Sequence, residues 1–134
     1  MNALLASSLR VLHVEDDPAI RAVASIALAK VGGFQLMSCA GGTEALQSGP
    51  EFDPHILLLD VMMPGMDGPA TLAGLAKRMK IDGRLILFMT AKVQPSDLEQ
   101  YRSSGAHGVI IKPFDAMRLH LQVMEHWRAL NARS

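Results

Sequence analysis

Two uninterrupted apolar runs constrain the fold of this 134-residue chain more than any other feature. They cover residues 55–59 and 85–89. A strand with one face in water alternates apolar and polar residues, whereas these runs do not alternate. Continuous runs of this length are typical of parallel strands that helices cover on both faces. Because helix-like segments separate the strand-like ones, the sequence predicts an α/β fold with a parallel sheet between two helical layers.

Local signals place the other elements. Asp17-Pro18 predicts the start of a helix, since Asp is a good N-cap and Pro suits the first helical position. Ser96 and Glu99 have the spacing of a capping box. The strands are expected over residues 9–14, 34–39, 55–59, 85–89 and 109–111, and five helices over 17–31, 42–47, 72–79, 96–105 and 116–130. Residues 9–130 are expected to form one domain, with a short N-terminal arm at 1–8 and a C-terminal tail at 131–134.

The charge balance and the single cysteine narrow the classes of function. Lys+Arg and Asp+Glu both number 13, which disfavours a general nucleic-acid binder. Cys39 alone excludes an internal disulfide and a multi-cysteine metal site. No apolar run approaches the length of a membrane span, and no signal peptide is recognisable. We therefore expect a cytoplasmic protein without a membrane partner.

Polar side chains follow four of the five expected strands. Glu15 and Asp16 follow the first, Asp60 the third, Thr90 the fourth and Lys112 the fifth. Ligands of such folds bind beyond the carboxyl ends of the strands, so we expect these groups to converge. Three carboxylates would repel one another; Lys112 offsets one charge, and a cation such as Mg²⁺ would offset more. Each residue alone has an ordinary structural explanation, but their joint placement favours aspartyl-phosphate chemistry.

The chain also resembles a known family. Its order and spacing of motifs are similar to those of the two-component response-regulator receiver domain, over residues 9–130. The matching segments are Glu15-Asp16-Asp17, residues 59–68, Thr90-Ala91 and Lys112-Pro113-Phe114. The resemblance implies a flavodoxin-like doubly wound sheet of five strands in the order 2-1-3-4-5 with five helices, like a stand-alone chemotaxis regulator.

The resemblance also implies a role for each matching residue. Asp60 would accept the phosphoryl group, while Thr90 and Lys112 would bond its oxygens. Mg²⁺ would be the only cofactor, held by Glu15, Asp16, Asp60 and the backbone carbonyl of Met62. Lys112-Pro113 would be a cis peptide bond, and Asp17 is left as a helix cap.

The function implied is a signalling switch in a phosphorelay, not an enzyme beyond its own phosphorylation and dephosphorylation. A histidine kinase or histidine phosphotransfer protein would supply the phosphoryl group. An unknown downstream protein, or a second copy, would bind the face of the fourth helix, fifth strand and fifth helix; direct nucleic-acid binding is not expected. One alternative is a receiver fragment of a longer regulator with a DNA-binding or kinase output domain. Another is an aspartyl-phosphate phosphatase, which is disfavoured because Met62 stands where such enzymes often carry a second acid.

Two positions depart from the family's pattern. Val109 stands where the family commonly has an aromatic residue that swings inward, and Tyr101 does not occupy the matching position. Met62 cannot orient water by hydrogen bonding, so we expect the aspartyl phosphate to be lost slowly.

The last helix spreads its apolar residues over an arc of about 200°, wider than a core-facing stripe needs. That arc predicts either a wide core face or an exposed strip for a partner.

Overall fold

A five-stranded parallel sheet runs through the centre of the molecule in the order β2-β1-β3-β4-β5. The structure is a computed structural model and describes residues 3–132. The strands are β1 (Arg10–Val14), β2 (Gln35–Cys39), β3 (Ile56–Asp60), β4 (Leu85–Thr90) and β5 (Gly108–Ile111). This is the strand order that the resemblance implied, and all five strands lie where the sequence predicted them to within a residue.

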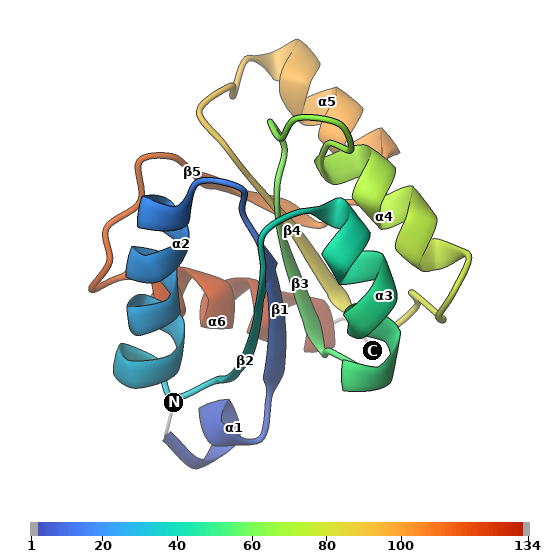
Figure 1. The fold of residues 1–134 in the computed structure, drawn as a ribbon. Helices are drawn as coiled ribbons and strands as arrows, with labels where there is room; N and C mark the ends of the chain where they lie inside the picture. Colours follow the sequence, from blue (N-terminus) through green and yellow to red (C-terminus); the bar gives the residue numbers. More distant parts are fainter. Residues whose placement is uncertain (1–2, 133–134) are drawn as a thin grey trace.

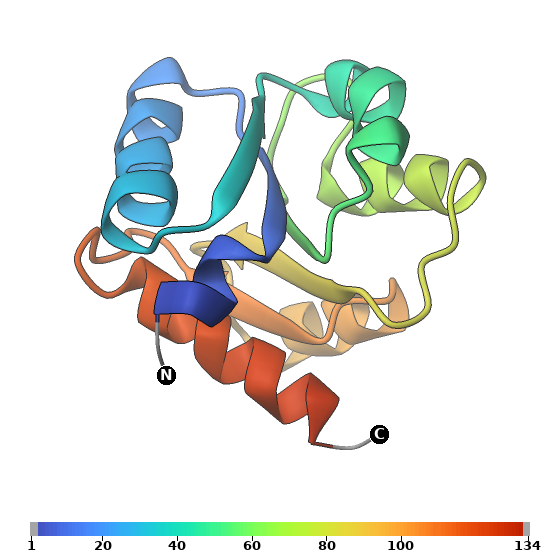
Figure 2. The ribbon, with the colours of Figure 1, turned by 90° about the horizontal axis from the view of Figure 1, so that it is seen from below.

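Helices cover both faces of the sheet (Figures 1 and 2). One layer holds α2 (Pro18–Ser25), the π-helical turn η1 (Ile26–Val31) that continues it, and α6 (Leu119–Asn131). The other layer holds α3 (Gly42–Phe52), α4 (Gly68–Ala76) and α5 (Pro95–Ser103). None of the helices within residues 3–132 is both long and apolar enough to cross a bilayer.

The central strands show why their sequences do not alternate. Every residue of β3 and β4 is buried. Ile56 and Leu58 belong to the core beneath α2 and α6, whereas Leu57 and Leu59 belong to the core beneath α3, α4 and α5. Successive side chains therefore point into different cores, and both faces of the strand must be apolar.

The starts of α2 and α5 can be compared with the capping signals that the sequence predicted. Asp17 caps α2 as predicted, since its Oδ1 accepts hydrogen bonds from the backbone N–H groups of Ala19 (2.9 Å) and Ile20 (3.2 Å). The capping box predicted at Ser96 is wrong. The helix begins at Pro95, and Asp97 Oδ2 accepts from the backbone N–H of Gln94 at 3.1 Å. Pro at the first helical position fixes the start earlier than the Ser-x-x-Glu spacing indicated.

The helices differ from expectation more than the strands do, and the expected arm (1–8) and tail (131–134) lie partly outside the described residues, at 1–2 and 133–134. A sixth helix, α1 (Ala3–Ser7), forms where a loose arm was expected, because Ala6 and Leu9 are buried in the core beneath α2 and α6. The helix expected over residues 42–47 continues to Phe52 and includes Pro50. The helix expected from residue 72 begins at Gly68, and the last helix begins at Leu119 instead of residue 116.

The wide apolar arc of α6 serves mainly as a core face. Leu119, Val123 and Met124 are buried, and Trp127 packs partly against them. Leu121 remains 48% exposed on the same helix. The core explanation thus accounts for most of the arc and leaves a small exposed apolar area.

Gly68 lets the start of α4 pack against the end of β3. A Cβ at this position would lie 2.7 Å from the carbonyl oxygen of Asp60, and backbone cannot retreat as a side-chain end can. We expect Gly68→Ala to lower the free energy of unfolding by about 2 kcal/mol, the usual cost of overpacking. Urea denaturation measures this loss. Gly41→Ala is the matched control, because nothing lies within 4 Å of a Cβ there; a loss of equal size in both variants would contradict the argument.

Candidate functional site

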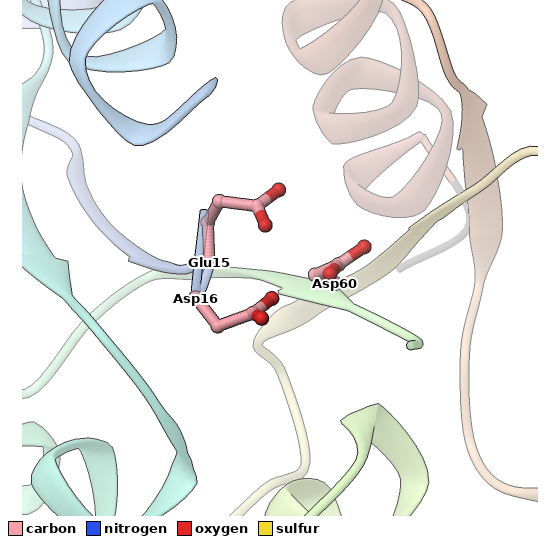
Figure 3. Close-up of side chains that lie close together, drawn as sticks. All are labelled: Glu15, Asp16 and Asp60. Carbon is pink, nitrogen blue, oxygen red and sulfur yellow. The ribbon is translucent and has the colours of Figure 1, made fainter. Parts of the chain in front are cut away.

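Three carboxylates converge at the carboxyl edge of the sheet, as the sequence predicted. Glu15 and Asp16 follow β1 and Asp60 ends β3, and one oxygen of each lies within 4.8 Å of the others (Figure 3). Glu15 and Asp60 are buried, with 1% and 3% of their surface exposed. Asp16 lies closer to solvent. Adjacent parallel strands bring these groups together, since β1 and β3 are direct neighbours.

Lys112 joins the cluster from the loop after β5. Its Nζ donates to Glu15 Oε1 at 2.8 Å and to Asp60 Oδ1 at 3.0 Å. The Lys112-Pro113 peptide bond is cis, as the resemblance implied. One ammonium therefore faces three carboxylates, and the cluster retains a negative charge that a divalent cation would offset.

Burial and charge set the ionisation of this cluster. Burial raises the pKa of Asp60 to about 6; the hydrogen bond from Lys112 opposes this rise, and the charge of Glu15 adds to it. Burial works to lower the pKa of Lys112, but its hydrogen bonds to Glu15 and Asp60 outweigh burial and raise it. The lysine thus stays cationic at neutral pH. A cation bound to the carboxylates would favour the ionised form of Asp60.

The turn between β1 and α2 is fixed by contacts that the sequence analysis missed. Arg21 Nη1 donates to the carbonyl oxygens of Glu15 (2.8 Å) and Asp16 (3.4 Å). Glu15 Oε2 accepts from the backbone N–H of Asp17 at 3.1 Å. A signal for Arg21 exists in the sequence, because it is the one charged residue between Pro18 and Ser25.

Thr90 stands at the end of β4 and is almost fully buried. Its Oγ1 accepts from the backbone N–H of Lys92 at 3.0 Å and lies 3.4 Å from the hydroxyl oxygen of Tyr101. Thr90, Asp60 and Lys112 all line one open cavity of about 620 Å³. The structure therefore brings together every side chain that the sequence analysis assigned to the site.

The remaining wall of this cavity is apolar. It is lined by Ala19, Ile20, Val23, Met62, Ala91, Pro113 and Phe114. Met62, two residues after Asp60, is 62% exposed. A buried carboxylate with an ammonium beside it thus lies in a hollow whose rim offers apolar contacts to an incoming molecule.

Comparison with known families agrees with this geometry. The family model of the response regulator receiver domain matches residues 11–124, which includes all of the clustered side chains. The chain belongs to the response regulator receiver domain family.

Relatives of this receiver domain are bacterial response regulators. It is 32% identical over 120 residues to the DNA-binding response regulator MtrA of Mycolicibacterium smegmatis, covering 89% of this chain and 50% of that protein. It is 33% identical over 112 residues to the transcriptional regulatory protein CseB of Streptomyces coelicolor, covering 83% and 46%. The chain thus spans about half the length of these curated relatives. The chemotaxis protein CheY4 of Vibrio cholerae has a similar structure, with a TM-score of 0.81, 26% identity and coverage of 87% and 97%.

The aromatic residue whose hydroxyl approaches Thr90 comes from α5 in this receiver domain. Val109, half-buried on β5, occupies the position where the sequence analysis noted an aromatic residue in the family. Tyr101 of α5 places its hydroxyl beside Thr90 instead. The sequence analysis noted only that Tyr101 does not occupy the matching position, and it did not predict this contact.

Proposed function

We propose that this receiver domain accepts a phosphoryl group on Asp60 and thereby switches its binding to a partner. The observation that carries the proposal is the buried Asp60 carboxylate, 3.0 Å from Lys112 Nζ and open to the 620 Å³ cavity. A histidine kinase or histidine phosphotransfer protein would supply the phosphoryl group. Acetyl phosphate is the small-molecule equivalent of such a donor.

The chemical step is an in-line transfer. A carboxylate oxygen of Asp60 forms a bond to the phosphorus while the donor's phosphorus–nitrogen bond breaks, and the released imidazole keeps the electron pair. With acetyl phosphate, a phosphorus–oxygen bond breaks and acetate leaves. Lys112 would hold one phosphoryl oxygen by charge, and Thr90 would donate a hydrogen bond to another. Hydrolysis then returns Asp60 and inorganic phosphate.

The carboxylate cluster fits a magnesium ion. Hard oxygen donors are the ligands that Mg²⁺ prefers, and Lys112 neutralises only one of the three negative charges. Glu15, Asp16, Asp60 and the backbone carbonyl of Met62 would hold the ion. When bound, it supplies positive charge for the phosphoryl oxygens.

The apolar rim indicates where a donor protein would dock. Val23 on α2 is 46% exposed, and Ile20 beside it lines the same cavity. A histidine entering between α2 and the Pro113-Phe114 segment would reach Asp60 while its own domain covers these side chains. We place this exchange in the cytoplasm and limit the catalysis to the domain's own phosphorylation and dephosphorylation.

The output would pass through the face formed by α5, β5 and α6. Leu98 (42%), Ile111 (55%) and Leu121 (48%) are exposed apolar side chains on these elements. A downstream protein or a second copy of the chain would cover them.

The alternative that this receiver serves a longer regulator is favoured by one observation, that the curated relatives are about twice as long. The length of the natural protein decides between a stand-alone receiver and a receiver within a longer regulator.

Intact-mass measurement tests the proposal. The chain is incubated with acetyl phosphate with Mg²⁺ or with EDTA, next to Asp60→Asn. We expect one phosphoryl adduct that requires Mg²⁺ and is absent from the variant. An adduct on Asp60→Asn, or none on the wild type with either acetyl phosphate or a phosphorylated histidine donor, would overturn it.

Met62 makes the lifetime of the phosphoryl group a second test. Its exposed thioether lines the cavity and orients water poorly. We expect Met62→Asn to speed phosphoryl loss roughly five- to tenfold, the effect of one hydrogen bond of about 1 kcal/mol in the transition state. Mass spectrometry after removal of acetyl phosphate follows the decay. Met62→Leu should decay like the wild type, and equal rates for Asn and Leu would contradict the prediction.

A further inference from the structure

Tyr101, the single tyrosine of the chain, connects Thr90 to the inner side of α5. Its side chain is buried, and its ring packs edge-to-face on Phe88 of β4, with centroids 5.7 Å apart. The hydroxyl donates to the backbone carbonyl of Lys92 at 3.0 Å. The same oxygen lies 3.4 Å from Thr90 Oγ1.

The protons of this cluster can be assigned from its contacts. The proton of Tyr101 is used in its bond to Lys92, so Thr90 is the donor in the contact between the two hydroxyls. A hydroxyl has one proton to donate. A phosphoryl oxygen on Asp60 is a charged acceptor, and charged acceptors form the stronger hydrogen bonds. If Thr90 donates to the phosphoryl group, it must release Tyr101.

Tyr101 also lines a second hollow, away from the carboxylates. A groove of about 460 Å³ lies between α5 and β5, and Leu98, Ala106 and Val109 share its wall with Tyr101. Val109 is aliphatic, so among these four side chains Tyr101 is the one with an aromatic ring. One end of Tyr101 therefore contacts Thr90, and its flank forms the groove.

We propose that Tyr101 is the positioning residue that couples phosphorylation of Asp60 to the α5–β5 groove. The coupling rests on the proposed function, because the phosphoryl group is what competes for the Thr90 proton. In the unphosphorylated state Thr90 holds the Tyr101 hydroxyl. In the phosphorylated state Tyr101 keeps only its bond to Lys92, and the wall of the groove rearranges. The coupling aromatic residue thus comes from α5 and not from β5.

Fluorine labelling tests whether phosphorylation of Asp60 changes the surroundings of Tyr101. Incorporated 3-fluorotyrosine reports on Tyr101 alone, since the chain has one tyrosine. We expect its ¹⁹F resonance to shift when Mg²⁺ and acetyl phosphate are added, and to stay in place in Asp60→Asn. Intact mass on the same samples separates a failure of the coupling from a failure of the proposed function. A phosphoryl adduct without a ¹⁹F shift overturns the coupling and leaves the proposed function standing, whereas absence of any adduct overturns both.

Amide resonances test whether the change at Tyr101 reaches the α5–β5 groove. Tyr101→Phe keeps the ring on Phe88 and removes only the hydroxyl. We expect its phosphorylated form to show less than half of the wild-type shift changes at Ala106, Gly108 and Val109. Leu98→Ala, on the same groove but without contact to Thr90, should retain them. A purely structural role would lower the melting temperature of Tyr101→Phe and leave its phosphorylation-induced shifts at full size, which would overturn the proposal.

Discussion

Replacing Lys112 with Met should destabilise the domain by about 3 kcal/mol in Mg²⁺-free buffer. Its ammonium is the hydrogen-bond partner of both buried carboxylates, Glu15 and Asp60. Removing one partner of a buried ion pair leaves an uncompensated charge, which typically costs 3–5 kcal/mol. The lower end applies because the cavity admits water and the pKa of Asp60 is already raised. Urea denaturation at pH 7.5 measures the loss.

Two further measurements identify the cause. Adding Asp60→Asn to Lys112→Met should recover at least half of the loss, because one of the repelling carboxylates is gone. Lys77→Met, an exposed lysine at the end of α4, should change stability by less than about 0.5 kcal/mol. If Lys112→Met were as stable as Lys77→Met, the ion pairs would contribute nothing to folding.

The same substitution should slow phosphorylation. Losing one donor to a developing phosphoryl charge typically reduces a rate by 100-fold or more. We therefore expect Lys112→Met to accept phosphate from acetyl phosphate about 100-fold more slowly at saturating Mg²⁺. The initial rate of adduct formation measures this effect. An unchanged rate would remove Lys112 from the transfer step and leave it a structural role alone.

The parallel topology explains why the position of the site was predictable. Glu15, Asp60 and Thr90 each follow or end an apolar run, and the carboxyl ends of parallel strands meet at one edge. Placing these residues together required only the strand ends, which hydrophobic runs locate well. No rotation of a helix about its axis entered the prediction.

Helix faces were less predictable, and α5 shows why. Its start was placed at Ser96 with a capping box to Glu99, whereas the helix begins at Pro95 and it is Asp97 that bonds the backbone N–H of Gln94. Successive residues of a helix differ by about 100° in direction, so an uncertain start leaves the inward face undetermined. The contact between Tyr101 and Thr90 depends on that face, whereas Val109 could be recognised from its position in the sequence alone. Arg21 was missed for another reason: it is the one charged residue of α2, but that signal does not show that its guanidinium bonds backbone carbonyls.

His13 should make the domain sensitive to acid. It lies on β1 with a fully buried side chain, and neither ring nitrogen has a hydrogen-bond partner among the described residues. Burial, and then the charges of Lys112 and Arg21, lower its pKa from 6.5 to about 4. The folded protein therefore keeps His13 neutral at a pH where the unfolded chain protonates it.

The sign of the effect follows from proton linkage. Between pH 6.5 and about pH 4 the unfolded state binds more protons at His13, so the free energy of unfolding falls as the pH falls. The whole contribution amounts to about 3 kcal/mol, at 1.36 kcal/mol per pKa unit. It is fully present above pH 6.5 and lost below about pH 4. Asp60 acts in the opposite direction, because burial raises its pKa to about 6.

The measurement therefore uses Asp60→Asn as the background, which removes the opposing carboxylate. Urea denaturation gives the free energy of unfolding of each protein at pH 7.5 and at pH 4.5. We expect this free energy to fall between the two pH values in Asp60→Asn, and to fall by at least about 2 kcal/mol less in His13→Leu/Asp60→Asn. Leucine has a similar volume and needs no hydrogen-bond partner, so the double variant should fold at neutral pH. Parallel pH profiles for the two proteins would mean that His13 is protonated in the folded state as readily as in the unfolded chain. In that case the charged ring would have to find hydrogen-bond partners for both nitrogens, neither of which has one among the described residues.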